Sequence, residues 1–567
     1  MKASDLFVQC LEHEGIEYIF GVTGEENADF VQSLQHSERI RFILTRHEQG
    51  AAFMAEAYGK LTGNPAVCLG TLGPGATNLI TGVADANMDH APMLVITGQG
   101  ATTRQHKESH QIMDVVNMYK PVTKWAQAVH HPDSIPEIVR KAVRTARGEK
   151  PGAVLIELAE NIAQMDTTTA PMEPRRFRRP GPDDEISDRA YELIRQARAP
   201  IIIAGNGAMR KRASNQLRAL AERTGIPVTT TFMGKGAVDY EADHALYTIG
   251  LGQWDHVADA VRDADVVITV GYDLVEYPPQ LWNPDATETI VHIDFDPAEI
   301  DYEYHPEVEL VGDIAHALWQ LDRRFSRDGV PDYDFTVQHA ARTRMRADIE
   351  EHANDDTEGV IRPQKAVWDV RQALGPHDIV LCGVGAHKMW VGRHHHCREP
   401  NTCLIPNGFC SMGMPLPGAI GASLVAGERR VLGIAGDGDF LMNVQEMETR
   451  APARREHHPA RLGRQRLRPD LLEAGRTLRQ PYRSGVRQSG LAALGRVLRL
   501  AGSVRGQCAR SARRARRRPE SPRPVAGGHP DRLPREHEAV EEARCLFRPV
   551  GLFIIDRQVH DLGTSKR

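Results

Sequence analysis

The sequence predicts an α/β protein made of three doubly wound domains, each with a parallel sheet. Short apolar runs rich in β-branched residues alternate with segments of helical spacing, which is typical of parallel sheets covered on both faces by helices. A chain of 567 residues is also too long for one hydrophobic core. Two polar stretches, Asp166–Asp184 and Asp322–Arg362, interrupt the alternation. We therefore expect domains at residues 1–165, 186–325 and 360–449, followed by a tail at 450–567.

The expected elements of the first domain are buried strands and helices in alternation. The strands are Tyr18–Val22, Phe42–Leu44, Ala66–Thr71, Pro92–Gly98 and Ala153–Leu158, and the helices lie across Gly50–Thr62 and Asp133–Ala146.

The other two domains repeat this pattern. The second has expected strands at Pro200–Ala204, Val228–Thr231, Asp265–Gly271 and Thr289–Asp294. The third has expected helices at Pro363–Leu374 and Pro417–Leu424 and expected strands at Asp378–Cys382 and Val431–Ala435.

Composition excludes several classes of protein. No apolar run approaches the ~18 residues that span a membrane, and the first residues lack the apolar core of a signal peptide. Eight cysteines occur without a CxxC pair, which predicts free thiols in a reducing cytoplasm.

The turn Gly436-Asp437-Gly438 follows the predicted strand Val431–Ala435 directly. An Asp in this position lies at the carboxyl edge of a parallel sheet, where doubly wound folds bind their ligands. Its hard oxygen atoms suit Mg²⁺, which is commonly bound together with phosphates. Three residues are a short motif, and an ordinary strand-to-helix turn has the same pattern.

Two further residues have both a functional and a structural interpretation. Glu48 stands where the strand Phe42–Leu44 turns into a helix, and a solvated carboxylate is favoured there by the helix dipole. Met412 precedes a glycine-rich helix, and methionine is most often a core residue. Their place among the other motifs favours a functional role for both.

The motifs resemble, in their order along residues 1–449, the FAD-independent, catabolic-type acetolactate synthases, which depend on thiamine diphosphate. The segments that carry the resemblance are GEEN at 24–27, TRHEQGAAFMA at 45–55, TLGPGATNL at 71–79, QIMD at 111–114, YDLVEYPP at 272–279 and AHKMW at 386–390. A glutamate in RHEQGAA followed by a GPGATN loop is more specific than either motif alone.

This resemblance implies a fold of the pyruvate-oxidase/decarboxylase type, with pyrimidine-binding, central and diphosphate-binding domains. It implies condensation of two pyruvate molecules to 2-acetolactate and CO₂ through a hydroxyethyl-thiamine diphosphate intermediate. Thiamine diphosphate and Mg²⁺ are the expected cofactors, and the site is shared between subunits of a dimer or tetramer. FAD is not expected, because YDLVEYPP replaces the pattern of FAD-containing relatives, and Gly205-Asn206-Gly207 lacks the third glycine of a dinucleotide loop.

The resemblance also assigns roles to individual residues. Glu48 is expected to hydrogen-bond the aminopyrimidine ring, and Gln111 and Lys124 to lie near the substrate, with Gln111 reaching across the subunit interface. The expected cofactor-binding residues are Pro74, Asn78, Ala386, His387, Asn407, Met412, Gly436, Asp437, Gly438 and Asp439, with Asp437 as the metal ligand.

Two features depart from the family or stand outside it. Gly383 occupies a position where the family usually has Asp. The run His394-His395-His396-Cys397 invites a metal interpretation, but adjacent residues cannot all face one ion, so we expect a solvated loop.

The tail differs sharply in charge from the rest of the chain. From residue 450 onward it carries 28 Lys and Arg against 11 Asp and Glu, a net +17, whereas residues 1–449 carry −22. Such asymmetry is typical of nucleic-acid binding. A shifted reading frame explains it better, because out-of-frame codons of a GC-rich gene drift toward Arg, Pro, Gly and Ala.

The codons of the tail can restore the family pattern. With suitable codons, Leu462–Ala474 read one nucleotide later encodes WDDNAYGLISWK, and the segments 486–495 and 527–538 can be restored likewise. The restored Asn and Gly fall over Gln465 and Arg468, where the family supplies further Mg²⁺ ligands. As written, residues 450–567 are expected to be poorly ordered and to leave the third sheet uncovered beyond Val431–Ala435.

Three alternatives to an active acetolactate synthase remain at this point, of which a nucleic-acid binder with a basic tail is the least favoured. One is another thiamine-diphosphate-dependent decarboxylase or carboligase that acts on a different 2-oxo acid. Another is a catalytically dead remnant that only oligomerises. We expect neither a nucleic acid nor a membrane as partner.

Overall fold

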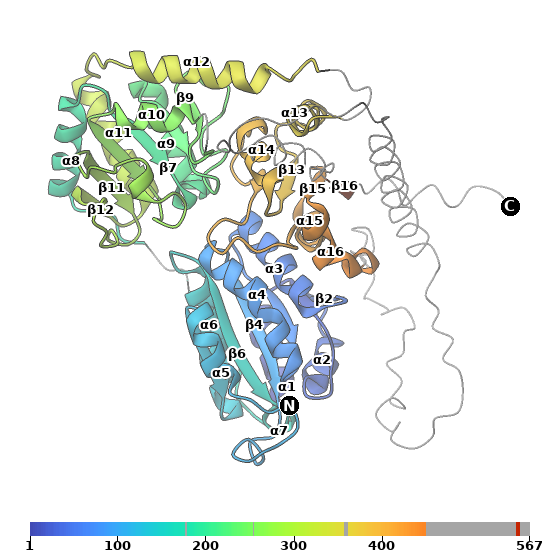
Figure 1. The fold of residues 1–567 in the computed structure, drawn as a ribbon. Coiled ribbons are helices and arrows are strands. Elements are labelled where there is room, and N and C mark those ends of the chain that lie inside the picture. The colour runs from blue at the N-terminus through green and yellow to red at the C-terminus, as the bar shows by residue number, and fades with distance from the viewer. Residues whose placement is uncertain (176–178, 253–254, 356–360, 450–550, 556–567) are drawn as a thin grey trace, which may run out of the picture. The chain divides into compact units, whose positions relative to one another are not determined.

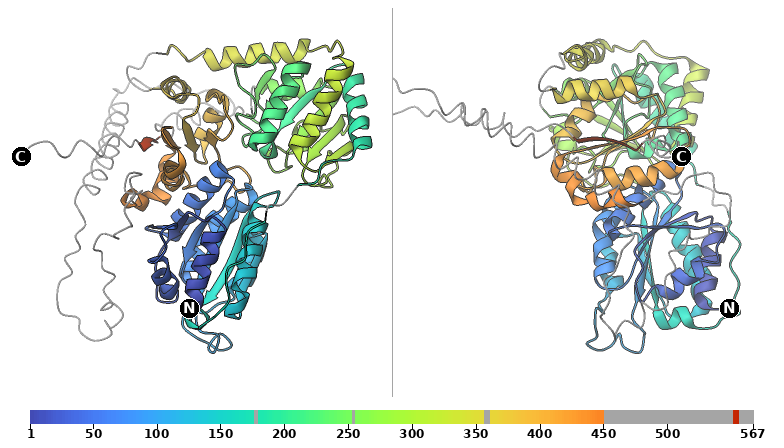
Figure 2. Two further views of the ribbon diagram at one scale, coloured as in Figure 1. Left: turned by 180° about the vertical axis from the view of Figure 1, so that it is seen from behind. Right: turned by 90° about the vertical axis from the view of Figure 1, so that its right-hand side faces the viewer.

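A computed structural model describes residues 1–175, 179–252, 255–355, 361–449 and 551–555 (Figure 1). The predicted fold class is confirmed within these ranges, because three sheets follow one another along the chain and are packed with helices. The prediction of poor order in the tail falls on residues that, apart from 551–555, lie outside the described ranges. Figure 2 shows the same elements from two further sides.

The first sheet has six parallel strands in the order β2-β1-β3-β4-β6-β5. Its strands are β1 (Tyr18–Gly21), β2 (Arg41–Leu44), β3 (Ala66–Gly70), β4 (Met93–Gln99), β5 (Trp125–Val129) and β6 (Ala153–Ala159). Its helices are α1 (Ala3–His13), α2 (Ala28–Leu34), α3 (Glu48–Thr62), α4 (Pro74–Met88), α5 (Val115–Tyr119), α6 (Ile135–Arg147) and α7 (Glu160–Gln164).

Alternate residues of each strand in this sheet enter two separate cores. Ile19, Val67 and Leu94 pack with α1, α2, α6 and α7, whereas Phe20 and Cys68, one position further along their strands, pack with α3 and α4. Strands buried on both faces explain the continuous apolar runs of the sequence.

The second sheet has six parallel strands in the order β12-β11-β10-β7-β8-β9. Its strands are β7 (Ile201–Ala204), β8 (Val228–Thr230), β9 (Ala245–Thr248), β10 (Val266–Val270), β11 (Thr289–Asp294) and β12 (Pro306–Val311). Its helices are α8 (Asp184–Gln196), α9 (Lys211–Thr224), α10 (His256–Arg262), α11 (Ile314–Asp328) and α12 (Thr336–Glu350).

The third sheet has the order β14-β13-β15-β16. Its strands are β13 (Ile379–Cys382), β14 (Cys403–Leu404), β15 (Val431–Ala435) and β16 (Gly551–Ile555), and its helices are α13 (Pro363–Ala373), α14 (Ala386–His394), α15 (Pro415–Val425) and α16 (Asp437–Met442). Short 3₁₀ turns lie at Lys120–Val122, Pro132–Ser134, Asn206–Met209, Pro279–Leu281 and Val444–Glu448.

The expectation of an uncovered edge at β15 is wrong. Strand β16 pairs antiparallel with β15 over its full length, from Val431 opposite Ile555 to Ala435 opposite Gly551. A run of apolar residues, GLFII, supplies this strand, and pairing satisfies backbone groups that an edge leaves exposed.

Helix α3 packs directly on α15, so the first and third domains share a core. Phe53 and Ala57 of α3 lie in one cluster with Ile379 and Leu381 of β13 and with residues of α15. Gly421 makes the approach possible, because a Cβ atom there would lie 2.4 Å from the carbonyl oxygen of Met54.

This close approach predicts an unusual effect of alanine. Gly→Ala in a helix interior normally stabilises a protein, but Gly421→Ala should lower the free energy of unfolding by about 1–3 kcal/mol, because backbone of α3 must move. Denaturant unfolding measures the change.

The matched control is Gly375→Ala, where the nearest atom to a new Cβ is 3.5 Å away, at the Asp378 carboxylate. If both variants unfold at the same denaturant concentration as the unaltered chain, the packing of α3 on α15 is looser than described.

Candidate active site

Glu48 opens α3 directly behind the carboxyl end of β2. Its side chain is 8% exposed, and its Oε2 accepts a hydrogen bond from Asn78 Nδ2 at 3.0 Å. A carboxylate in the first turn of a helix also lies in the favourable field of the helix dipole. The alternative of a solvated carboxylate is therefore wrong, and two of the predicted site residues lie in contact.

Gln111, in the loop after β4, lies against the loop before α4. Gly73 has φ of +50°, and a Cβ on it would lie 3.0 Å from the Cβ and carbonyl oxygen of Gln111. Pro74 is the first residue of α4, and a Cβ on Gly75 would lie 3.6 Å from Glu48 Oε1. Gln111 itself has φ of +58°, a strained value of the kind that clusters at functional sites.

A buried polar pair supports the loop that carries Gln111. Gln99 Nε2 donates to the carbonyl oxygen of Met113 at 3.0 Å and to Glu157 Oε2 at 2.9 Å. Burial raises the pKa of the Glu157 carboxyl to about 7. Gln99 therefore links this loop to a buried carboxyl whose pKa is raised.

Lys124 lies at the other edge of this sheet. It precedes β5, and its backbone N–H donates to the carbonyl oxygen of Ala153, where β6 begins. Its Nζ donates to the carbonyl oxygens of Gly148 and Lys150 at 2.8 and 2.6 Å. The structure thus gives Lys124 a role in holding this turn and does not bring it together with Glu48.

The Asp437 turn has the position that the sequence predicts, at the carboxyl end of β15. Asp437 is exposed, and its Oδ1 accepts a hydrogen bond from the N–H of Gly438 at 2.9 Å. Met412 is half-buried, and its Cε would lie 3.7 Å from a Cβ on Gly438. Met412 therefore packs on the turn at the protein surface rather than inside a core.

Asp439 points away from the turn into the protein. It is 1% exposed, and its Oδ1 accepts a hydrogen bond from the N–H of Gly413 at 2.5 Å. Asn443 Nδ2 donates to the carbonyl oxygen of the same glycine at 2.9 Å. Asp439 also fills the space that an Asp at position 383 would need, because a Cβ on Gly383 would lie 1.7 Å from Asp439 Oδ2.

His387 stacks against the glycine that begins the turn. It follows Ala386, the first residue of α14, and a Cβ on Gly436 would lie 3.2 Å from its Cε1. Its Nε2 is 3.5 Å from Asp439 Oδ2, and both buried atoms lack a hydrogen-bond partner in the described part of the chain. This pair leaves two buried polar atoms unsatisfied beside the turn.

The side chain of Asn407 is hydrogen-bonded to residues outside the Asp437 turn. Its Oδ1 accepts a hydrogen bond from Lys388 Nζ at 2.6 Å, and its Nδ2 donates to the carbonyl oxygen of Glu276 at 3.1 Å. Its side chain therefore serves the contact with the central domain, and the structure does not bring it together with Asp437.

Three carboxylates that sequence analysis missed connect the first and third domains. Asp89 accepts from the N–H of Gly408 at 2.7 Å, and Asp85 accepts from the N–H of Ser411 at 3.1 Å. Glu446, fully buried, accepts from the N–H groups of Arg46 and His47 directly before Glu48. The signal for the first two was present, since acidic residues four apart on one face of an apolar helix are uncommon.

Family models match three parts of the chain. Residues 1–118 match the N-terminal TPP binding domain of thiamine pyrophosphate enzymes, residues 187–321 the central domain, and residues 383–457 the C-terminal TPP binding domain. The chain belongs to the thiamine pyrophosphate enzyme family. Thiamine pyrophosphate is the same molecule as thiamine diphosphate.

Several members of this family named acetolactate synthase are similar to the chain. The acetolactate synthase of Bacillus subtilis (strain 168) is 33% identical over 459 residues, which cover 79% of each protein. The chloroplastic acetolactate synthase 1 of Nicotiana tabacum is 34% identical over 459 residues, 79% of this chain and 68% of its own. A probable acetolactate synthase large subunit of Methanocaldococcus jannaschii is 33% identical over 466 residues, 79% of this chain and 78% of its own.

The residues present fit the organic cofactor of this enzyme family. Gly75 carries no side chain beside Glu48, and Gly73 carries none beside Gln111. Near the Gly436–Gly438 turn, buried atoms of His387 and Asp439 have no hydrogen-bond partner among the described residues. For Mg²⁺ the described residues offer Asp437 as an exposed carboxylate. Mg²⁺ prefers octahedral oxygen ligation, and the positions expected for further protein ligands, Gln465 and Arg468, lie outside the described residues.

In the central domain, the crevice where strand order reverses, between β10 and β7, is closed by protein atoms. A Cβ on Gly271 would lie 2.3 Å from the Cα of Gly207, so the two turns touch through bare backbone. Glu276 accepts hydrogen bonds from the N–H of Asn206 at 2.9 and 3.1 Å and from the hydroxyl of Thr231. A carboxylate therefore occupies one backbone amide of the turn with which such folds bind a pyrophosphate.

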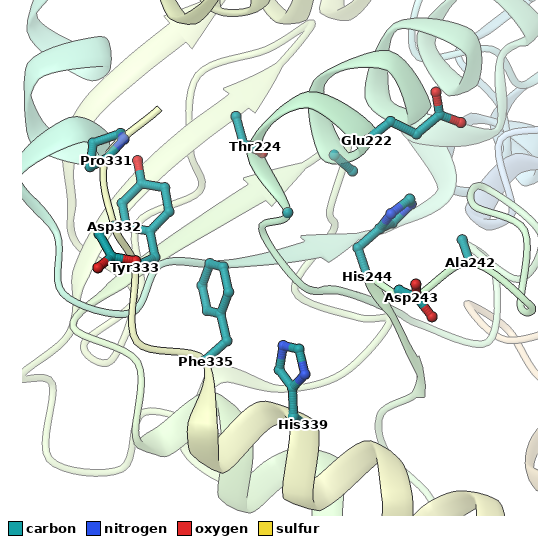
Figure 3. Close-up of a pocket in the computed structure, with 12 residues that line it drawn as sticks. Glu222, Thr224, Ala242, Asp243, His244, Pro331, Asp332, Tyr333, Phe335 and His339 are labelled. Carbon is teal, nitrogen blue, oxygen red and sulfur yellow. The ribbon is translucent and has the colours of Figure 1, made fainter. Parts of the chain in front are cut away.

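The central domain also has a surface hollow of about 570 Å³ (Figure 3). Phe335 and His339 project from the start of α12, with Tyr333 on one side and His244 on the other. Burial lowers the pKa of the His244 imidazole. The predicted site residues do not line this hollow.

Among the described residues, no helix has the length and apolar character needed to span a membrane.

The Glu157 carboxyl predicts a pH dependence of stability in this member of the family. Its folded pKa, about 7, is higher than its ordinary value of 4.5, so its contribution to stability is fully present below pH 4.5 and is lost as pH rises through 7. The change is at most about 1.4 kcal/mol per pH unit. Denaturant unfolding between pH 5 and 8 should show Glu157→Gln gaining stability relative to the unaltered chain as pH rises.

Glu137→Gln, at an exposed carboxylate on α6, is the control and should keep a constant difference from the unaltered chain. A difference for Glu157→Gln that does not change between pH 5 and 8 would contradict this account of the buried carboxyl.

Proposed function

We propose that this chain is an acetolactate synthase, which condenses two pyruvate molecules to 2-acetolactate and CO₂ with thiamine diphosphate and Mg²⁺. The observation that carries the proposal is the geometry at Glu48, a buried carboxylate fixed by Asn78 beside a bare glycine loop and Gln111. The acetolactate synthases among its relatives support the choice of reaction.

Each residue of the site has a part in this proposal. Glu48 exchanges a proton with a ring nitrogen of the aminopyrimidine, and Asn78 keeps the carboxylate oriented. Met412 supports the cofactor from the diphosphate side, where Asp437 offers its carboxylate to the metal. Thiamine diphosphate, when bound, supplies the electron sink for decarboxylation. Gln111 orients pyruvate beside Glu48.

The assembly and its location are part of the same proposal. We infer a dimer or tetramer in which Glu48 of one copy serves a cofactor held by Asp437 of another. The six described cysteines are free, which supports a reducing compartment, the cytoplasm. No FAD is needed, and the closure of the central crevice by Glu276 supports this part.

Glu48→Gln tests the proton role. With the chain loaded with Mg²⁺ and thiamine diphosphate, exchange of the cofactor's C2 proton for deuterium should slow by at least 10²-fold, the lower range for general acid–base catalysis. Quenched-flow NMR measures the rate, and circular dichroism checks that the variant is folded. Glu137→Gln is the control, and unchanged exchange in Glu48→Gln would refute the assignment.

The alternative of another 2-oxo acid decarboxylase or carboligase differs from the proposal in the step after decarboxylation, the addition to a second pyruvate. Incubation with pyruvate should yield 2-acetolactate, detected after acid decarboxylation as acetoin. Acetaldehyde as the sole product would favour a simple decarboxylase.

We also infer that the residues after 449 are encoded in a shifted reading frame. In a chain with the frame restored, the Asn and Gly that the family uses as metal ligands would stand in place of Gln465 and Arg468. This inference is supported by relatives that align over 79% of the chain. The frame-restored chain should bind Mg²⁺–thiamine diphosphate in calorimetry and form 2-acetolactate. The chain with the present sequence should bind the cofactor weakly and form no product, as expected of a catalytically inactive remnant. Equal binding and activity of both chains would contradict the inference, and resequencing the DNA around codons 448–462 checks it directly.

A further inference from the structure

Three potential metal ligands meet in the third domain, outside the site described above. His395 directly follows α14, Cys397 lies two residues later, and Cys403 opens the edge strand β14. Each offers one ligand atom, and these three atoms lie within 4.8 Å of one another. The possible ligands are therefore two residues of the run that are separated by one position, His395 and Cys397, together with Cys403 from the neighbouring strand.

The expected solvated loop is wrong at this position, because the cluster is buried. His395 is 1% exposed, Cys397 0% and Cys403 5%. The Nδ1 atom of His395 is buried and has no hydrogen-bond partner among the described residues. Leaving a buried polar nitrogen unsatisfied costs about 1–3 kcal/mol, so native structures seldom do it without a reason.

The neighbouring His394 and His396 also have a buried ring nitrogen without a hydrogen-bond partner among the described residues, but neither belongs to the cluster of three ligand atoms. The ring of His396 stacks on Tyr240 at 4.9 Å between ring centroids with an angle of 11°. His395 has an extended backbone, and in extended chain residues two apart project to the same side. This explains how His395 and Cys397 face one point while His396 turns toward the central domain.

The charge around the cluster favours thiolates. Lys235 is fully buried, and its Nζ donates to the carbonyl oxygen of Gly392 at 2.8 Å and to Thr248 Oγ1 at 3.1 Å. Within the described residues no carboxylate forms an ion pair with it, and its charge acts on both cysteines. A buried ammonium needs a nearby negative charge, and ionised sulfur atoms can supply it.

We propose that His395, Cys397 and Cys403 form a structural binding site for one thiophilic closed-shell metal ion, Zn²⁺ or Cu⁺. Imidazole and thiolate are the ligands that both ions prefer. Metal–sulfur bonds of about 2.3 Å and metal–nitrogen bonds of about 2.0–2.1 Å would need only small movements of atoms already within 4.8 Å of one another. Two thiolates balance Zn²⁺, whereas with Cu⁺ they leave one negative charge that matches Lys235.

The bound ion would cross-link the end of α14 to the edge strand β14. The same segment contacts the central domain, since the N–H of Tyr240 donates to the carbonyl oxygen of Cys397 at 3.3 Å. Binding displaces the thiol protons of both cysteines into solution, with no redox change. The site would thus stabilise the contact between the second and third domains and take no part in the carbon chemistry.

The test uses the purified full chain, stripped of metal and kept reduced, in separate titrations with Zn²⁺ and Cu⁺. One equivalent of either ion should bind and raise the melting temperature of the chain. The ion that binds more tightly is the one for which the site is suited. With Co²⁺ as a probe, a thiolate-to-cobalt charge-transfer band in the near ultraviolet should appear.

The variants separate this cluster from other cysteines of the chain. Cys403→Ser and His395→Gln should each lose one bound equivalent relative to the unaltered chain, and Cys403→Ser should weaken the charge-transfer band, whereas Cys10→Ser should lose neither. His395→Gln keeps both sulfur atoms, so it remains informative if Cys403→Ser does not fold.

Two results would overturn the proposal. One is a bound equivalent and band that persist unchanged in both cluster variants. The other is the absence of binding by the reduced chain.

Discussion

The structure depends on the close packing of α3 against α4 and α15. Glycines of both neighbouring helices make this packing possible. A Cβ on Gly82 of α4 would lie 2.6 Å from the Cβ of Ala52, and a Cβ on Gly421 of α15 would clash with the backbone of Met54. Interiors are packed as densely as organic crystals, so contacts of this kind fix a helix within a fraction of an ångström. Because Glu48 is the first residue of α3, its position follows from that packing.

Buried carboxylates then join the third domain to the first. Asp85 and Asp89 end α4 and bind backbone N–H groups of the loop that carries Met412, while Lys60 pairs with Glu56 and Asp89. Burial raises the pKa values of Glu56 and Asp85. Carboxyl groups held this way are costly to bury unless every partner is in place, so the cluster favours one arrangement of the loop over others.

Most of the fold could be predicted because buried parallel strands have a strong local pattern. Three of the elements that were missed lack it: β5 is an edge strand of partly exposed residues, β14 has two residues, and α12 is mostly polar with a narrow stripe of Ala341, Met345 and Ile349. Strands β9 and β12 were also missed, although β9 is fully buried. Edge strands and surface helices are recognised by what they pack against, which a single sequence window does not contain.

The sequence by itself determined the three α/β units, the order of the motifs, and the place of Glu48 and Asp437 at the ends of strands, because these follow from local periodicity and turn chemistry. Only the tertiary structure decided that Asp439 holds Gly413, that Asn407 faces the central domain, that Lys124 lies at the opposite sheet edge, and that His395 meets Cys403. Such contacts depend on which strands become neighbours and which loops meet above them. That choice is made by the packing of whole helices and sheets, and no short stretch of sequence contains it.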